Sequence, residues 1–314
     1  MRSRMHRSYL PFPERFFSGS VILTSMQQWA FCAIFFLSTF LGTELNKARS
    51  QEISSDVSPR THLQFPGERL DEWHGFKRHR FDFQGNEAWV VEPRKTLEGG
   101  WFTWCLMFPD AFTDRCAVPA LLERGFYHVY LSVGNSFGSP ASVQQLADFH
   151  DFLMERGFAQ KAVLIGISRG GLYAHRYAAE HPTRVRVIYG DAPVLDMKSW
   201  PGGRGKGKGS PSDWEAMKNA YGFTNEDQAI NYNGNPIDTL EPLAQHSIAI
   251  IYVSGDADDV VPIEENALLA TERYRKLAGT VELIRKPGVG HHPHGLEDPM
   301  PVVEFILQHI SASE

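Results

Sequence analysis

A candidate nucleophile, Ser168, lies in the sequence Gly-Ile-Ser-Arg-Gly at residues 166–170. Apolar residues precede this sequence and an Ala-, Tyr- and His-containing segment follows it, so the serine stands where a buried strand should end and a helix begin. Glycines two positions before and after a serine permit the sharp, strained turn that exposes its hydroxyl group. The start of the helix would direct backbone N–H groups to the same place, and the N–H of Arg169 could stabilise an oxyanion. Taken alone, the stretch fits a nucleophile and a capped, glycine-rich turn equally well.

A serine nucleophile needs a general base and an acid that orients the base. Candidates for both follow predicted strands later in the chain. The segment at 253–262 carries Asp256, Asp258 and Asp259, and the segment at 286–295 carries His291, His292 and His294. Because ligands bind at the carboxyl ends of strands in open parallel sheets, we expect these side chains to gather near the serine. The chemistry would be acyl transfer through a covalent intermediate.

Three motifs in this order resemble those of the α/β-hydrolase superfamily over residues 76–314: G-x-S-x-G-G, then G-x-x-D-x-V-V-P, then G-x-G-H. The resemblance implies that the acid is Asp258, three residues after a glycine, and that the base is His291, directly after Gly-Val-Gly. It leaves Asp256 as a rival acid and Asp191, which ends an earlier strand, as a fallback. The other polar residues of the two loops are expected at turns, caps or the rim of the site: Asp259, His292 and His294.

The resemblance also implies a second oxyanion donor in the loop after the apolar strand at 101–109. The His-Gly-Gly-Gly run of lipases is absent here. Met107, Phe108 and Asp110 are the candidates, since Pro109 has no N–H. We take Phe108 as the second donor beside Arg169. The side chain of Arg169 is expected either to contact the substrate or to form a structural salt bridge.

The His-His-x-His sequence at 291–294 raises the alternative of a metal site. Its spacing matches no usual zinc pattern, and the sequence offers no obvious carboxylate or cysteine partner. We therefore predict no metal ion in the site and no cofactor in the reaction.

Alternating strands and helices form the expected framework. Two segments at 76–85 and 87–93 alternate polar and apolar residues like an antiparallel pair. The later strands are expected at 101–109, 127–133, 161–168, 185–193, 247–256 and 280–288, and the helices at 117–125, 142–157, 171–182, 264–279 and 299–310. Short apolar strands alternating with helices predict an α/β-hydrolase fold, whose mostly parallel central sheet is flanked by helices, in one domain at 76–314.

A cap or lid insertion at about 196–243 interrupts this alternation after the strand that ends near Asp191. Its length and its position at the carboxyl end of a strand favour a role in binding. We take Trp200 as a substrate-binding residue, while Trp214 and Tyr221 line the same pocket or form a small core within the insertion. A Gly-rich run of cations either meets an anionic substrate, such as a uronic acid ester, or is a solvated loop: Arg204, Lys206 and Lys208.

Residues 1–50 are predicted to be a secretory signal region. Several arginines precede a 14-residue apolar run at 29–42, and the small-x-small sequence at 48–50 fits a cleavage site. An uncleaved anchor is the alternative. Residues 51–75 are expected to be an irregular linker. We therefore expect a secreted or periplasmic protein with no stable membrane span after cleavage.

The composition narrows the class of protein. The chain has 314 residues, of which 42% are hydrophobic and 22% charged, as in ordinary globular proteins. A formal net charge of -6 argues against nucleic-acid binding, which favours a basic surface. Three cysteines are too few for a disulfide scaffold, although Cys105 and Cys116 either pair or remain separate buried thiols.

The expected function is that of a secreted serine hydrolase that cleaves a carboxylic ester, with a small-molecule or saccharide ester as its partner. G-x-S-x-G-G also resembles prolyl-oligopeptidase-type enzymes, so a serine peptidase or aminopeptidase is the first alternative. Those enzymes typically carry a large N-terminal propeller, and too few residues precede position 76 for us to expect one. The second alternative is an inactive binding protein on the same fold.

Overall fold

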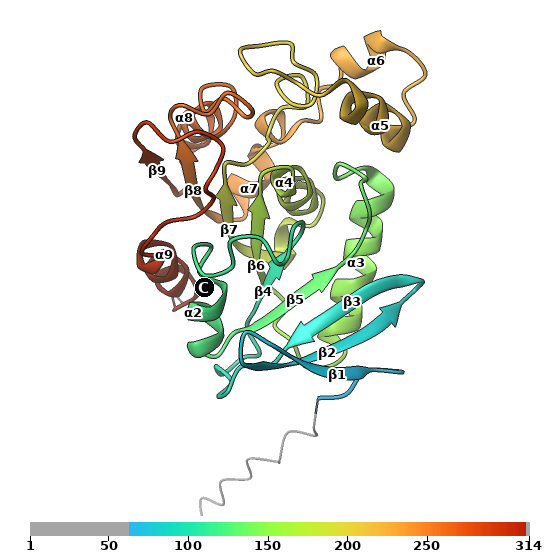
Figure 1. Ribbon diagram of the computed structural model, residues 1–314, viewed down its shortest axis with the longest axis vertical. Coiled ribbons are helices and arrows are strands. Elements are labelled where there is room, and N and C mark those ends of the chain that lie inside the picture. The colour runs from blue at the N-terminus through green and yellow to red at the C-terminus, as the bar shows by residue number, and fades with distance from the viewer. Residues whose placement is uncertain (1–62, 312–314) are drawn as a thin grey trace, which may run out of the picture. The chain divides into compact units, whose positions relative to one another are not determined.

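The computed structural model describes residues 63–311, which form one nine-stranded sheet with helices on both faces (Figure 1). The strands are β1 (Arg69–Trp73), β2 (Phe76–Phe83), β3 (Asn86–Val91), β4 (Phe102–Cys105), β5 (Tyr127–Leu131), β6 (Ala162–Ile167), β7 (Val185–Asp191), β8 (Ala249–Gly255) and β9 (Val281–Lys286). Their order across the sheet is β1-β2-β3-β5-β4-β6-β7-β8-β9. Pairing is antiparallel from β1 to β5 and parallel from there to β9. The predicted, mostly parallel sheet is therefore confirmed.

Two helical layers cover the sheet. The helices are α2 (Val118–Glu123), α3 (Pro140–Met154), α4 (Gly170–Glu180), α8 (Ala267–Lys276) and α9 (Met300–Ser311), with a short 3₁₀ turn, η1 (Pro182–Arg184). Side chains of α2 and α9 pack into one apolar cluster, and those of α3, α4 and α8 pack into another. β6 and β8 consist almost entirely of apolar residues because both of their faces are buried.

The antiparallel end of the sheet begins earlier in the chain than predicted. Residues 51–75 were expected to be irregular, but Arg69–Trp73 forms β1 and pairs with β2. Four of its five side chains are exposed, so this edge strand lacks the apolar alternation by which a strand is recognised. A bidentate ion pair between Arg78 and Asp71 joins the two strands at 2.8 Å. The β2–β3 turn is made by Gln84 and Gly85, both with positive φ.

The segment predicted to be a cap insertion contains α5 (Pro211–Tyr221), α6 (Glu226–Ile230), η2 (Pro236–Asp238) and α7 (Glu241–Gln245). Its buried side chains join the same apolar cluster as α3 and α4. In Figure 1, α5 and α6 lie beyond the upper end of α3. The insertion is therefore packed on the domain and shares its core.

Both cysteines of the described region are buried, free thiols. Cys105 donates a hydrogen bond to the carbonyl of Met107 at 3.1 Å, and burial raises its pKa to about 12. The pairing of Cys105 with Cys116, left open by the sequence, is absent from the structure.

The predicted signal region and most of the predicted linker lie outside the described residues. Within residues 63–311, none of the helices combines the length and the apolar character that a membrane crossing requires.

Candidate active site

Ser168 occupies a strained turn between β6 and α4. Its φ is +50°, a left-handed value that costs a non-glycine residue about 1–3 kcal/mol. The backbone holds it there, because its N–H donates to the carbonyl of Asp191 on β7 at 2.8 Å. The glycines are needed for space: a Cβ on Gly166 would lie 2.9 Å from the oxygen of Gly170, and one on Gly171 would lie 2.8 Å from the oxygen of Val194. These contacts therefore hold the half-buried Ser168 in its strained conformation.

A continuous chain of hydrogen bonds starts at this serine. Ser168 Oγ lies 2.9 Å from His291 Nε2, and His291 Nδ1 lies 2.7 Å from Asp258 Oδ2. The other oxygen, Asp258 Oδ1, accepts the N–H groups of Val260 and Val261 at 2.9 and 2.8 Å. The two carboxylate oxygens thus have different partners: one is fixed by the backbone and one faces the imidazole. The carboxylate side chain is fully buried, which strengthens its interaction with the imidazole.

The three hydrogen-bonded residues come from three loops at the carboxyl ends of parallel strands. Ser168 follows β6, Asp258 follows β8 and His291 follows β9. The glycine before the acid is needed for close approach, because a Cβ on Gly255 would lie 2.1 Å from the carbonyl oxygen of Val289 in the histidine loop. The residues predicted as nucleophile, acid and base are therefore brought together.

The rival acids lie elsewhere. Asp256 is exposed and accepts the N–H of Gly288 at 2.6 Å, as a turn residue would. Asp259 is exposed and forms an ion pair with Lys208. Asp191 is completely buried and contacts a histidine other than His291.

That histidine is His294, and its predicted position at the rim of the site is wrong. The sequence analysis placed His294 at the rim, but it is 3% exposed, and its Nδ1 lies 2.7 Å from Asp191 Oδ1. Asp191 Oδ2 also accepts the N–H of Gly295 at 2.8 Å and the hydroxyl of Tyr189 at 2.9 Å. The structure thus contains a second His–Asp pair, which the sequence spacing did not reveal.

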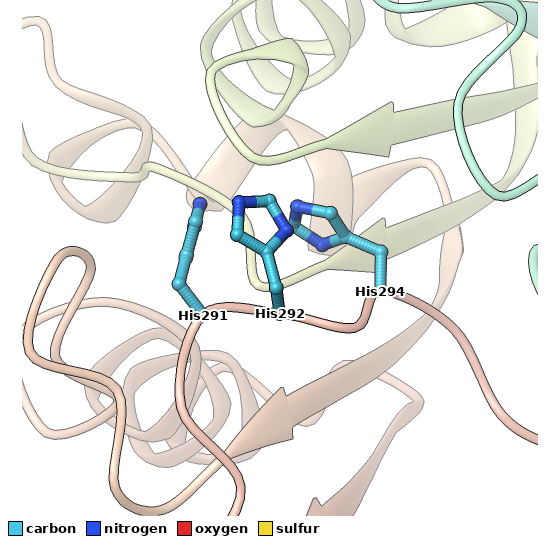
Figure 2. Close-up of side chains that lie close together, drawn as sticks. All are labelled: His291, His292 and His294. Carbon is cyan, nitrogen blue, oxygen red and sulfur yellow. The ribbon is translucent and has the colours of Figure 1, made fainter.

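His292 lies between the two paired histidines and is exposed, as expected of a rim residue. Figure 2 shows His291, His292 and His294 projecting from one loop toward the same side. Burial, together with the neighbouring charges of His294 and His291, lowers the pKa of His292. Its imidazole is therefore favoured in the neutral form.

The side chain of Arg169 forms a salt bridge, one of its two predicted roles. Its Nη1 lies 3.1 Å from Asp213 Oδ1 on α5 and also donates to Asn135. The guanidinium carbon lies 5.3 to 5.5 Å from the rings of Phe108, Phe137 and Trp200. Asn135 and Asp213 belong to no motif, so residue spacing offers no signal for this contact. The ion pair joins the turn at the serine to the insertion.

The predicted oxyanion donors lie on adjoining segments. Phe108 has a φ of +59°, a strained value for a bulky residue. A Cβ on Gly170 would lie 3.3 Å from the Cβ of Met107, so the loop after β4 rests against the start of α4. Within residues 63–311, the backbone N–H groups of Arg169 and Phe108 donate to no protein acceptor. Both amides are therefore available to a ligand.

Two of the aromatic residues predicted in the insertion have structural partners. Trp214 is 6% exposed and donates to Glu226, and the Tyr221 hydroxyl donates to the carbonyls of Phe137 and Gly138. Trp200 is half-buried beside the guanidinium of Arg169. The three cations of the Gly-rich run each face an acid, in the pairs Arg204–Glu226, Lys206–Glu264 and Lys208–Asp259.

The arrangement supports acyl transfer chemistry. A serine hydroxyl faces an imidazole, a carboxylate orients that imidazole, and two amide N–H groups are unused nearby. No part of this arrangement requires a metal ion or an organic cofactor.

Sequence and structure comparisons agree with this geometry. A family model described as the prolyl oligopeptidase family matches residues 139–311. No curated protein matches the sequence. Among solved structures, Est1E from Butyrivibrio proteoclasticus is 17% identical with a TM-score of 0.51, over 79% of this chain and 100% of its own.

Two peptidases share the same fold. The Pyrococcus horikoshii acylaminoacyl peptidase is 14% identical with a TM-score of 0.57, over 76% of this chain and 42% of its own. A puromycin-hydrolyzing peptidase from Mycobacterium tuberculosis is 14% identical with a TM-score of 0.54, over 78% of this chain and 40% of its own. This chain thus spans the whole of Est1E but less than half of either peptidase. The predicted α/β-hydrolase fold is confirmed.

Proposed function

Since this chain belongs to the prolyl oligopeptidase family and is a serine hydrolase of the α/β-hydrolase superfamily, we propose that it cleaves carboxylic esters through an acyl-enzyme on Ser168. The observation that carries the proposal is the hydrogen-bonded chain from Ser168 through His291 to Asp258.

In the proposed mechanism, Ser168 Oγ attacks the ester carbonyl while His291 Nε2 accepts its proton. Asp258 holds the proton on His291 Nδ1 and stabilises the imidazolium ion. The N–H groups of Arg169 and Phe108 donate to the oxyanion of the tetrahedral intermediate. His291 then returns its proton to the leaving alkoxide, the alcohol departs and the acyl group stays on the serine. Water, activated by the same imidazole, releases the acid and regenerates the hydroxyl.

One contact favours an ester over a peptide with a free amino terminus. An aminopeptidase needs a carboxylate for the ammonium group of its substrate, whereas Asp213 beside the serine turn is already paired with Arg169. The charge next to the nucleophile is therefore balanced, which suits a neutral ester.

A carbohydrate-linked ester fits the half-buried indole of Trp200, because a flat aromatic ring beside a polar guanidinium offers both apolar and hydrogen-bonding contacts. We also propose that the enzyme is secreted or periplasmic, on the basis of the basic and apolar sequence of residues 1–50.

The test is a substrate panel of p-nitrophenyl esters, acetylated sugars, uronate methyl esters and aminoacyl arylamides. We expect turnover of esters, and loss of that turnover in Ser168→Ala with an unchanged thermal midpoint. Hydrolysis of arylamides without hydrolysis of any ester would refute the ester proposal.

A serine peptidase is the second candidate function, because the matching family model and two of the structural neighbours are named for peptidases. The arylamides in the panel test it directly. An inactive binding protein is the remaining alternative, and a fluorophosphonate probe distinguishes it, since a binding protein would form no adduct on Ser168.

A further inference from the structure

We propose that His291, His292 and His294 form a binding site for Zn²⁺, and that the bound ion inhibits the hydrolase. This inference rests on the proposed function for its inhibitory effect, but not for the binding itself. One ligand nitrogen from each of the three side chains can be chosen so that all three lie within 4.8 Å of one another. The rings project from one loop toward a common side (Figure 2).

The two outer histidines have the surroundings that zinc-binding histidines usually have. A ligating imidazole generally donates its second N–H to a carboxylate, which fixes its tautomer and strengthens the ligand. His291 Nδ1 faces Asp258 at 2.7 Å, and His294 Nδ1 faces Asp191 at 2.7 Å. Both pairs leave Nε2 as the nitrogen for a metal. The sequence offered no carboxylate partner for this cluster, whereas the fold supplies two.

The middle histidine supplies the adjustable ligand. Within the described residues, His292 makes no hydrogen bond, and its exposed ring stacks on Phe112 with a centroid distance of 5.8 Å. It lies edge-to-face to both neighbours, at 5.0 Å from His291 and 4.8 Å from His294. No hydrogen bond has to break when this ring turns toward a metal ion.

The spacing is close to that of a zinc site. Zn–N bonds are about 2.0–2.1 Å long, so two nitrogens in a tetrahedral site lie about 3.3 Å apart. One nitrogen from each ring can be chosen so that the three lie within 4.8 Å of one another, at most about 1.5 Å beyond this spacing. Rotation of the exposed His292 side chain can shorten its distances to the other two rings. Three imidazoles leave the fourth position to water.

Inhibition is expected because zinc binding and proton transfer from Ser168 both require His291 Nε2. His291 Nε2 lies 2.9 Å from Ser168 Oγ, and Nδ1 is held by Asp258. A zinc ion on Nε2 occupies the lone pair that would accept the serine proton. Metal binding and nucleophile activation are therefore mutually exclusive.

The experiment measures binding and inhibition separately on the full chain. Zn²⁺ is titrated calorimetrically into the wild type and into Ser168→Ala, in a buffer that does not chelate metals. The rate of p-nitrophenyl ester hydrolysis by the wild type and by the histidine variants is then followed against Zn²⁺, each protein being normalised to its own rate in chelator. We expect binding to both proteins, and loss of wild-type activity that chelator reverses.

Two matched histidine variants locate the site. His292→Gln should weaken both Zn²⁺ binding and inhibition by about tenfold or more, because one ligand is lost. His246→Gln, an exposed histidine on another segment, should change neither.

Absence of calorimetric binding, or binding that His292→Gln leaves unchanged, would overturn the proposed site. Binding that depends on His292 but does not slow hydrolysis would overturn the inhibitory role. Binding that depends on His292 in a protein that cleaves no substrate would support the metal site and refute the proposed function.

Discussion

Replacing Asp258 with asparagine should remove the hydrolytic activity while leaving the fold intact. The structure dictates how the substituted amide would lie. The N–H groups of Val260 and Val261 point at Oδ1 and require an acceptor, so the amide oxygen must stay there. The NH₂ group then faces His291 Nδ1, the position now taken by Oδ2 at 2.7 Å. Since NH₂ only donates, Nδ1 must accept, and the ring proton moves to Nε2.

A proton on Nε2 points at Ser168 Oγ and prevents the imidazole from acting as a base. In Ser–His–Asp enzymes the corresponding substitution lowers kcat about 10⁴-fold. Such a loss corresponds to about 5.5 kcal/mol of transition-state stabilisation. The free energy of unfolding should change by only about 1 kcal/mol, because the two backbone hydrogen bonds to the side chain persist.

The assay is kcat/KM for a p-nitrophenyl ester, together with the thermal midpoint and the rate of fluorophosphonate labelling. Asp256→Asn is the matched control, since this exposed side chain in the same loop also accepts a backbone N–H. It should retain activity within about threefold, because a surface substitution changes free energies by about 0.5 kcal/mol. A harmless Asp258→Asn beside a damaging Asp256→Asn would refute the assignment of the acid.

Three further outcomes are expected. His79 lies between two glutamates that raise its pKa despite the opposing effect of burial, so their interaction stabilises the fold below the unfolded pKa of 6.5 and is lost as the pH rises through the folded pKa. His79 in turn lowers the pKa of Glu92 from its ordinary value of 4.5, so this carboxylate contributes stability above pH 4.5. The free energy of unfolding lost in His79→Gln, about 1–3 kcal/mol, should therefore be largest between pH 4.5 and 6.5, as measured by denaturant titrations at several pH values. Gly255→Ala places a Cβ 2.5 Å from the oxygen of Gly290 and should lower the free energy of unfolding, measured by thermal unfolding, by about 1–3 kcal/mol. Gly290→Ala should lower it less, because the nearest atom to its Cβ would be 3.8 Å away. Asp213→Asn removes the negative charge that faces Arg169 and should raise the ratio of kcat/KM for an anionic ester to that for a neutral ester by about two- to fivefold. An unchanged ratio would show that the guanidinium does not meet the substrate.

Most of the framework could be predicted because its signals are local. Buried parallel strands are short apolar runs, and each of the eight predicted strands has a counterpart in the structure. The exception is Arg69–Trp73, which was assigned to a linker. An edge strand with exposed side chains needs no apolar pattern, since backbone pairing with β2 is sufficient to hold it.

The candidate site could be predicted where close backbone contacts require glycine. A Cβ on Gly166 or Gly255 would collide with a neighbouring backbone, and a required glycine can be recognised in the sequence. The hydrogen-bond partners of the polar groups cannot be recognised in this way. Asp213 lies 44 residues from Arg169, and Asp191 lies 103 residues from His294, so no spacing rule connects either pair.

The sequence by itself determined the order of the candidate nucleophile, acid and base and the strained turn at Ser168, because steric limits on the backbone act between near neighbours. Only the tertiary structure decided which carboxylate faces which histidine. The sheet order places β7 next to both β6 and β8, so Asp191 lies within reach of the histidine loop as Asp258 does. That loop then turns His291 toward one acid and His294 toward the other. Hydrogen bonds between distant segments form only after the strands have assembled, and this is why the second His–Asp pair, and with it the proposed zinc site, could not be read from residue spacing.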